Sequence, residues 1–313
     1  MKSILLFADP MYMQNKIFAT GNCHAKVRNC LREKGIKLDT VDQGRIKTCD
    51  ALLFFDLSAK RFLDLPRLVN EFGKSKKFIL TIWEPVVITP ASWDKNLHKF
   101  FDKIITWDDR LVDNKKYFKM NYPQSLLPFL GNKISFQQKK LCTMIAANKM
   151  YEHPDELYSE RLHAIQFFMK NAQKDFDLYG YNWEKFSFPL TCYKGSVRDK
   201  GEVLSKYRFA ICYENTKNAQ GYITEKIFDC FSGGAIPVYW GANNITDFIP
   251  DNIFIDRRKF ANYYELLHYL QSITEAEYNQ YIQNIKEFLQ SEAYNQFTID
   301  YYVTNMVRLL SDL

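Results

Sequence analysis

The segment that decides the fold spans residues 207–241 and reads YRFAICYENTKNAQGYITEKIFDCFSGGAIPVYWG. Its first part, residues 208–213, is a short apolar run rich in aromatic and branched side chains, which predicts a buried strand. A polar loop follows, and then residues 224–232 predict a helix that the glycine pair 233–234 ends. A second apolar run at residues 235–240 completes a strand, helix, strand unit. Such a unit indicates a parallel sheet.

The start of this predicted helix is suited to an anion. Thr224 is a plausible N-cap, and a helix N-terminus presents unpaired N–H groups and the positive end of the helix dipole. Lys226 in the first turn costs roughly 0.3–1 kcal/mol, so we expect an anionic group such as a diphosphate to compensate it. Asn215 and Glu225 could then bind ribose or sugar hydroxyls. In the alternative, Glu225 merely caps the helix and Lys226 is solvated, and a T-E-K sequence taken alone favours this alternative.

Short apolar runs alternate with amphipathic stretches along the rest of the chain. Further strands are predicted at residues 3–8, 51–56, 77–83, 103–107, 141–147, 176–179 and 252–255, and helices at residues 23–34, 63–72, 157–169 and within 263–313. A polar, helix-poor stretch at residues 114–140 separates the two halves. We therefore expect an α/β fold of two doubly wound domains, residues 1–132 and residues 133–313, the second including the C-terminal helices. Ligands would bind where strand ends face a crevice.

Composition and motifs exclude several classes of protein. The 313 residues carry a net charge of +6, and the basic residues are scattered, which speaks against nucleic-acid binding. Seven cysteines without a C-x-x-C pair predict neither a disulfide framework nor a zinc site. No P-loop or dinucleotide fingerprint is present. The D-x-D at residues 175–177 lies at the start of its predicted strand rather than at its end, so we expect no metal centre. No run approaches the ~18 apolar residues that span a bilayer, and the first ten residues predict a strand.

The segment at residues 207–241 resembles the donor-binding signature of the α-1,3/4-fucosyltransferases, glycosyltransferase family ten. The matching residues are Tyr207, Arg208, Phe209, Tyr213, Glu214, Asn215, Thr216, Tyr222, Ile223, Thr224, Glu225, Lys226, Ile236, Pro237, Val238 and Gly241. The upstream stretches KKLCTMIAANKM, ELYSERLHAIQFF and DLYGYNW are also similar to the family, so the likeness extends over residues 140–250. It implies a GT-B-like fold, in which two Rossmann-type domains face a central cleft. It also implies inverting transfer of L-fucose from GDP-fucose to O3 of an N-acetylglucosamine or glucose unit.

The resemblance further implies roles for five side chains that bind the donor. Arg161 and Lys226 would neutralise the diphosphate in place of a metal ion. Asn215, Tyr222 and Glu225 would hold the ribose and the fucose. Because GDP leaves with additional negative charge, the two cations would act mainly in the transition state.

The first half contains one candidate of comparable interest, in the sequence LTIWEP at residues 80–85. Glu84 lies just past a predicted strand, beside Trp83, and the family's proposed general base lies in a similar segment. Glu84 would remove the proton of the acceptor hydroxyl while C1 of the sugar is attacked from the face opposite GDP. On the residues alone, a surface glutamate that ends a strand fits equally well.

The expected partners are a GDP-sugar donor and a glycan acceptor, without nucleic acid. No cofactor is required on this interpretation, although it leaves room for stimulation by a divalent metal. The lack of an anchor in the sequence fits a cytoplasmic protein of bacterial or viral origin, with peripheral contact to the inner membrane face. Two alternatives stay open: an enzyme of the same fold that uses another nucleotide sugar, and a non-catalytic protein that binds a nucleotide or a carbohydrate.

Overall fold

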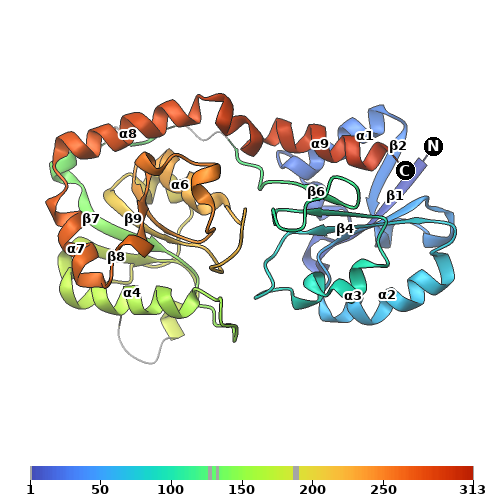
Figure 1. Ribbon diagram of the computed structural model, residues 1–313, viewed down its shortest axis with the longest axis horizontal. Helices are drawn as coiled ribbons and strands as arrows, with labels where there is room; N and C mark the ends of the chain where they lie inside the picture. Colours follow the sequence, from blue (N-terminus) through green and yellow to red (C-terminus); the bar gives the residue numbers. More distant parts are fainter. Residues whose placement is uncertain (1, 126–128, 132–133, 186–189, 313) are drawn as a thin grey trace. The chain divides into compact units, whose positions relative to one another are not determined.

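The computed structural model describes residues 2–125, 129–131, 134–185 and 190–312, and the chain divides into two compact units. The first unit comprises Met1–Pro123 and Gln296–Leu313, and the second comprises Gln124–Asn295. Each unit is built on a parallel sheet with helices packed against it (Figure 1). The expected α/β class, with two doubly wound units, is confirmed.

In the described part of the first unit, six parallel strands form one sheet in the order β2-β1-β3-β4-β5-β6. The strands are β1 (Lys2–Phe7), β2 (Ile36–Thr40), β3 (Ala51–Phe55), β4 (Lys77–Ile82), β5 (Lys103–Thr106) and β6 (Tyr117–Lys119), and the helices are α1 (Cys23–Glu33), α2 (Ala59–Phe72) and α3 (Lys95–His98). The central strands are nearly continuous apolar runs because both faces of a parallel sheet are covered. Leu52, Leu80 and Ile104 are accordingly inaccessible to solvent.

The strand order of the first unit reverses between β1 and β3. β1 pairs with β2 on one side and with β3 on the other, so the segments that follow β1 and β3 diverge at the carboxyl edge of the sheet. Ligands of open α/β sheets bind at such a point. Asp56 follows β3 at this edge, and Trp83 and Glu84 follow the adjacent strand β4.

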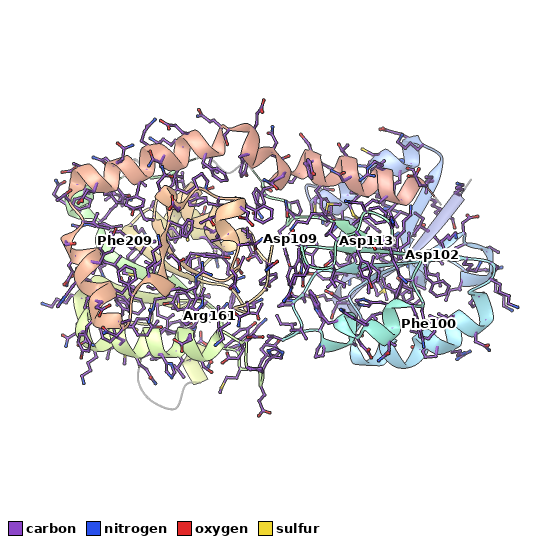
Figure 2. All side chains as sticks on the ribbon, viewed as in Figure 1. Phe100, Asp102, Asp109, Asp113, Arg161 and Phe209 are labelled. Atoms are coloured by element: carbon purple, nitrogen blue, oxygen red, sulfur yellow. The ribbon has the colours of Figure 1, made fainter. Side chains whose placement is uncertain are left out.

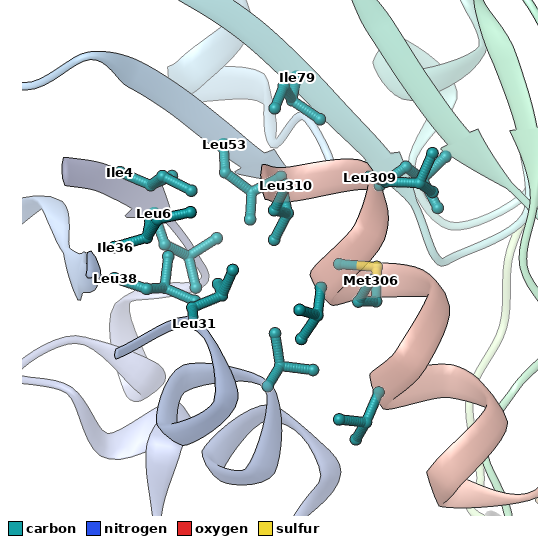
Figure 3. Packing of buried hydrophobic residues seen from close by; sticks show 14 of the residues in the cluster. Ile4, Leu6, Leu31, Ile36, Leu38, Leu53, Ile79, Met306, Leu309 and Leu310 are labelled. Atoms are coloured by element: carbon teal, nitrogen blue, oxygen red, sulfur yellow. The ribbon is translucent and has the colours of Figure 1, made fainter. Parts of the chain in front are cut away.

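The last helix, α9 (Ile299–Ser311), belongs to the first unit. Met306 and Leu310 of α9 pack in one buried cluster with Leu31 of α1 and Leu6 of β1 (Figure 3). The expected second domain of residues 133–313 is therefore wrong at its C-terminal end. The amphipathic period of α9 predicts a buried face, but it does not indicate which of two sheets that face covers.

In the described part of the second unit, five parallel strands pair in the order β11-β10-β9-β7-β8. The strands are β7 (Lys140–Ile145), β8 (Phe176–Tyr179), β9 (Tyr207–Tyr213), β10 (Ile236–Trp240) and β11 (Ile255–Asp256), and the helices are α4 (Tyr158–Asn171), α5 (Lys200–Leu204), α6 (Glu225–Gly233), α7 (Tyr263–Ser272) and α8 (Glu275–Leu289). The strand order reverses between β7 and β9, which places the expected ligand edge at their carboxyl ends. The strand predicted at residues 252–255 is shorter, because a 3-10 turn at Asp251–Ile253 precedes β11.

The glycine pair that ends α6 also permits a close backbone contact. Gly234 adopts the left-handed conformation, with φ of 70°, at the C-cap of α6. A Cβ atom on Gly234 would lie 2.2 Å from the Cα atom of Gly131, so these two backbones meet directly. Gly131 thus packs within the second unit, and the contacts divide the chain between Pro123 and Gln124 rather than at residue 132. Asn132 itself lies outside the described residues.

The described residues contain neither a membrane-spanning helix nor a cluster of metal-ligating side chains. None of the helices found there combines the length and the apolar character that crossing a membrane requires. Among the same residues, no group of three or more histidine, cysteine, aspartate or glutamate side chains is arranged to hold a metal ion.

Candidate active site

A buried ion pair ties the end of β9 to the start of α6. Glu214 directly follows β9, and its side chain is inaccessible to solvent. Its carboxylate accepts hydrogen bonds from the Thr224 amide (2.8 Å), the Thr224 hydroxyl (2.8 Å) and Lys226 Nζ (3.0 Å). Lys226 Nζ also donates to the Thr224 hydroxyl (2.9 Å). Hydrogen bonds to charged groups are the stronger ones, so this cluster fixes the geometry of the helix start.

Glu214 is the countercharge that the sequence-based reasoning missed. Burial alone lowers the pKa of Lys226, but the carboxylates of Glu214 and Glu225 outweigh burial, so the pKa of Lys226 lies above its ordinary value. The unfavourable cation at the helix start is therefore compensated within the protein. The available signal was an acidic residue at the end of an apolar strand, because a buried carboxylate requires a cation nearby.

Gly241, the last residue of the signature, is explained by packing against Glu214. A Cβ atom on Gly241 would lie 2.5 Å from Glu214 Cγ and 2.4 Å from Tyr239 Oη. The Glu214 amide also donates to the Trp240 carbonyl oxygen (2.8 Å). A side chain at position 241 would therefore displace the carboxylate that binds Lys226.

Arg161 brings a second cation to the same place. It lies in the first turns of α4 (Figure 2) and is 6% exposed. Its Nη2 donates to the carbonyl oxygens of Tyr213 (2.8 Å) and Glu214 (2.7 Å) and to Asn215 Oδ1 (3.0 Å). The charge of Arg161 is near enough to lower the pKa of Lys226. Among the described residues no carboxylate forms an ion pair with Arg161, so its charge is available to an anionic ligand.

Asn215 and Tyr222 lie beside Arg161. Asn215 Oδ1 accepts from Arg161, and Asn215 Nδ2 donates to the Tyr222 hydroxyl oxygen (3.2 Å). Tyr222 is only 1% exposed, whereas Asn215 is partly exposed. The buried Tyr222 therefore orients Asn215 through this hydrogen bond, and of the two side chains it is Asn215 that solvent reaches.

Glu225 opens α6, and its side chain is half exposed. Burial raises the pKa of Glu225, but the nearby Lys226 and Lys200 outweigh burial and hold its pKa below the ordinary range. Lys200 Nζ lies 3.9 Å from Glu225 Oε1 and 2.6 Å from Asp229 Oδ2. Glu225 is thus an accessible, ionised carboxylate at the helix start, suited to accept hydrogen bonds from ligand hydroxyls.

A pocket of about 140 Å³ opens beside Arg161, between the loop after β7 and the start of α4. Its lining consists of Ala147, Asn148, Lys149, Met150, Tyr151, Glu156, Tyr158, Ser159, Arg161, Leu162, His163 and Trp183. The guanidinium of Arg161 stacks over the Tyr158 ring at 4.6 Å. The aromatic rings of the lining, together with the cations Lys149 and Arg161, suit a ligand that is both flat and anionic.

In the first unit, side chains fix the backbone of the Trp83-Glu84 dipeptide from both sides. The carboxylate of Asp56 accepts from the amides of Trp83 (2.9 Å) and Glu84 (3.1 Å). The Trp83 carbonyl oxygen accepts from the indole of Trp107 (2.9 Å), and the Glu84 carbonyl oxygen accepts from the indole of Trp93 (3.0 Å). All four backbone polar groups of the dipeptide therefore have side-chain partners.

This arrangement is unusual for an ordinary strand end, because most backbone hydrogen bonds in proteins go to other backbone groups. The Tyr122 hydroxyl and the Thr89 hydroxyl add further donors to the same two carbonyl oxygens, Tyr122 to that of Trp83 and Thr89 to that of Glu84. The surrounding groups hold Glu84 at a defined place on the carboxyl edge of the first sheet. Such preorganisation is what a group engaged in proton transfer requires.

The structure thus gathers five of the six predicted site residues, Arg161, Asn215, Tyr222, Glu225 and Lys226, at the carboxyl edge of the second sheet. Glu84 lies at the corresponding edge of the first sheet. Two further residues, Glu214 and Asp56, carry much of this geometry and were not predicted. In the sequence, each of them is an acidic residue at the end of an apolar run, and this pattern does not show which groups it will contact.

Comparison with known proteins identifies the family. Residues 136–308, more than half of the chain, match the model described as glycosyltransferase family 10 (fucosyltransferase) C-term. The chain is similar to the alpha-(1,3)-fucosyltransferase FucT of Helicobacter pylori, with 40% identity over 77 residues (24% of this chain and 16% of the relative). It is also similar to an alpha-(1,4)-fucosyltransferase of Arabidopsis thaliana, with 39% identity over 70 residues (22% of this chain and 17% of the relative). The matched segments thus span about a sixth of each relative.

Solved structures show the same fold at low identity. A crystal structure of an alpha1,3-fucosyltransferase superposes with a TM-score of 0.65 at 16% identity, covering 100% of this chain and 90% of that one. An alpha-glucosyltransferase in complex with UDP-glucose and DNA superposes with a TM-score of 0.59 at 12% identity, covering 99% of this chain and 98% of that one. These likenesses confirm the expected GT-B type of fold. The family model, which matches more than half of the chain, shows that the chain belongs to glycosyltransferase family 10.

Proposed function

We propose that this protein is an inverting fucosyltransferase that carries L-fucose from GDP-fucose to a sugar hydroxyl, O3 of an N-acetylglucosamine or glucose unit. The observation that carries the proposal is the position of Arg161. Its buried guanidinium has no carboxylate partner among the described residues, and it lies beside the start of α6 and lines a pocket. A buried cation without a countercharge is costly, which favours an anionic ligand at Arg161.

The donor is proposed to bind through residues of the second unit. Arg161 would bind the diphosphate through the guanidinium donors that its backbone contacts leave over, and Lys226 would contribute part of its charge while it stays paired with Glu214. Glu225 and Asn215 would accept and donate hydrogen bonds to the hydroxyls of ribose and fucose. Tyr222 would act through Asn215, because its own hydroxyl is buried.

The reaction is a single displacement. Glu84 accepts the proton of the acceptor hydroxyl, and the acceptor oxygen forms a bond to C1 of fucose. The bond between C1 and the diphosphate oxygen breaks on the opposite face, so the anomeric centre inverts and the electron pair leaves with GDP. Arg161 and Lys226 stabilise the charge that develops on the leaving diphosphate.

We propose that this stabilisation needs no metal ion, because the two cations take its role. A divalent cation could still raise the rate by a contact with GDP. Turnover measured with excess EDTA and then with added Mg²⁺ or Mn²⁺ tests this part of the proposal. Loss of more than about nine tenths of the activity in EDTA, restored by metal, would contradict it.

The experiment that tests the function is release of nucleotide from a panel of donors, with and without N-acetyllactosamine. We expect GDP release from GDP-fucose that depends on the acceptor, and much slower release from GDP-mannose, UDP-galactose and UDP-glucose. Faster turnover of another donor would favour the alternative of a different nucleotide sugar. Tight GDP binding without turnover on any acceptor would favour a non-catalytic binding protein.

A second class of acceptor has support from one comparison. Over 159 residues, the chain is 30% identical to the GDP-fucose protein O-fucosyltransferase 3 of Xenopus tropicalis, which covers 48% of this chain and 33% of that relative. A folded protein with exposed serine and threonine side chains therefore belongs among the acceptors tested. Fucose incorporated into that protein, with none incorporated into the disaccharide, would replace the glycan acceptor proposed above.

A further inference from the structure

A second carboxyl group lies directly beside Glu84 in the first unit. Asp56 follows β3 and adopts a left-handed backbone conformation, with φ of 54°. This conformation is uncommon for residues other than glycine, although aspartate and asparagine tolerate it best. It turns the chain at the carboxyl edge of the sheet, where the Asp56 carboxylate meets the amides of Trp83 (2.9 Å) and Glu84 (3.1 Å).

The remaining contacts of Asp56 come from the 3-10 helix η5 (Pro90–Trp93) and the residue before it. The Ser92 hydroxyl lies 3.3 Å from Asp56 Oδ1 and also accepts from the Leu57 amide (2.7 Å). The Thr89 hydroxyl lies 3.5 Å from the same carboxylate oxygen. Asp56 therefore joins three separate segments, the ends of β3 and β4 and the start of η5, around one carboxylate.

We infer that Asp56 is a positioning residue for Glu84. Asp56 holds the Glu84 backbone in place, and the negative charge of Asp56 strengthens Glu84 as a base. This role rests on the proposed function, in which Glu84 takes the proton of the acceptor hydroxyl. The effect of Asp56 on the reaction passes through the backbone contacts and through the repulsion between two neighbouring carboxylates, which raises the proton affinity of each.

The surroundings of Asp56 place its ionisation in the neutral range. Burial raises the pKa of Asp56 to about 7; the amides of Trp83 and Glu84 and the Ser92 hydroxyl oppose this rise, and the charge of Glu84 adds to it. Below about pH 7 Asp56 is neutral and accepts hydrogen bonds weakly. Above that pH it is charged, holds both amides more strongly and makes Glu84 more basic. Turnover should therefore rise with pH through this range.

His24 is a second titratable group near Asp56 and Glu84. His24 of α1 packs with its ring against Phe55 and Trp83, and burial lowers the pKa of His24 to about 4, so it stays neutral. Asp56 is thus the group expected to respond between pH 6 and pH 8, roughly one unit on each side of its pKa.

The test uses the full chain, with Asp56→Asn as the variant, because asparagine keeps the shape and also tolerates the left-handed backbone. Asp50→Asn is the matched control: Asp50 lies at the opposite end of β3, and its carboxylate accepts from the Ser3 amide (2.7 Å). GDP release is measured with GDP-fucose and the acceptor from about pH 5.5 to pH 9, where general-base residues titrate.

We expect Asp56→Asn to lower kcat by about tenfold or more, while the KM for GDP-fucose stays within about twofold. We also expect the rising limb of its pH profile to move to lower pH by about half a unit or more, because Glu84 loses a negative neighbour. Asp50→Asn should leave kcat, KM and the position of the limb unchanged. An unmoved limb in Asp56→Asn would overturn the electrostatic role even if kcat fell.

A second variant guards against loss of folding. Asp56→Gly keeps the left-handed turn without a carboxylate and should show the same shift of the limb, with a larger fall in kcat because both amides lose their acceptor. Unchanged turnover in both variants would overturn the positioning role while leaving the proposed function intact. A wild-type chain that releases no GDP on any acceptor would instead remove the proposed function, and this role with it.

Discussion

Exchanging Glu214 for glutamine tests whether the ion pair with Lys226 holds the donor site together. Glutamine keeps nearly the same volume and one carbonyl oxygen, so the Thr224 amide can retain its acceptor at 2.8 Å. The second oxygen becomes an NH2 group, which faces the Lys226 ammonium where the carboxylate accepted a bond at 3.0 Å. Two donors then oppose each other in a buried place, and the countercharge of Lys226 is lost.

The expected cost follows from these contacts. A hydrogen bond to a charged group contributes about 1.5–3 kcal/mol, and breaking a fully buried pair costs about 3–5 kcal/mol. The Lys226 side chain is 26% exposed, so water recovers part of that cost. We therefore expect the free energy of unfolding to fall by about 2–3 kcal/mol, which lowers the melting temperature of a unit of this size by roughly 5–10 °C.

Calorimetry of the full chain, with and without GDP, measures this effect. The transition that GDP raises is assigned to the second unit, because a ligand stabilises the part of a protein that binds it. The double variant Glu214→Gln/Lys226→Met should be less destabilised than the sum of its single changes, by about 1–2 kcal/mol. Additive effects, or a loss below about 1 kcal/mol in Glu214→Gln, would refute the conclusion that Lys226 depends on Glu214 for its countercharge.

Three further outcomes are expected. Arg161→Lys keeps the charge but loses the planar fork, so titration calorimetry should show GDP binding weakened by about tenfold or more, and unchanged affinity would exclude Arg161 from the diphosphate site. Glu84→Ala should lower turnover by about a hundredfold while the Kd for GDP stays within about twofold, and an equal loss of both would contradict its role as base. Burial lowers the pKa of His24 from 6.5 to about 4, so as the pH falls the unfolded chain binds a proton at His24 before the folded chain does. The contribution of neutral His24 to the free energy of unfolding is therefore complete above pH 6.5. It declines between pH 6.5 and pH 4, by up to about 3 kcal/mol. Urea titrations at pH 6.5 and pH 4 should show a smaller decline for His24→Phe than for the wild type. An equally steep decline in the variant would mean that another group causes the pH dependence.

Elements whose causes are local could be predicted from the sequence. The apolar run at residues 208–213 appears as β9 (Tyr207–Tyr213), and the helix predicted at residues 224–232 appears as α6 (Glu225–Gly233). Thr224 is the N-cap, and Gly234 ends the helix in the left-handed conformation. Each of these features depends on residues within one turn or one strand, so the sequence contains its cause.

Features that depend on tertiary contacts could not be predicted. To predict that α9 packs on the first sheet, one must know which of the two sheets has a face that other helices leave uncovered. The spacing of apolar residues in α9 fits either sheet equally well. The pairing of Glu214 with Lys226 requires the relative placement of β9 and α6. The contact of Asp56 with Glu84 joins residues 28 positions apart, through the neighbouring positions of β3 and β4 in the sheet.

The charges at the carboxyl edge of the second sheet nearly balance, which bears on how a diphosphate would be released. Lys226 is paired with Glu214, and Lys200 is paired with Asp229, so of these two lysines and Arg161 it is Arg161 that has no carboxylate partner among the described residues. A site with several unpaired cations would bind GDP tightly before and after transfer, and uniform binding of this kind does not accelerate the chemical step. A lysine that shares its charge with a buried glutamate has a different property under the proposed function. While it stays paired with Glu214, it can interact more strongly with the diphosphate as the C1–O bond breaks and negative charge grows. Glu214 would then favour product release as well as holding the helix start in place.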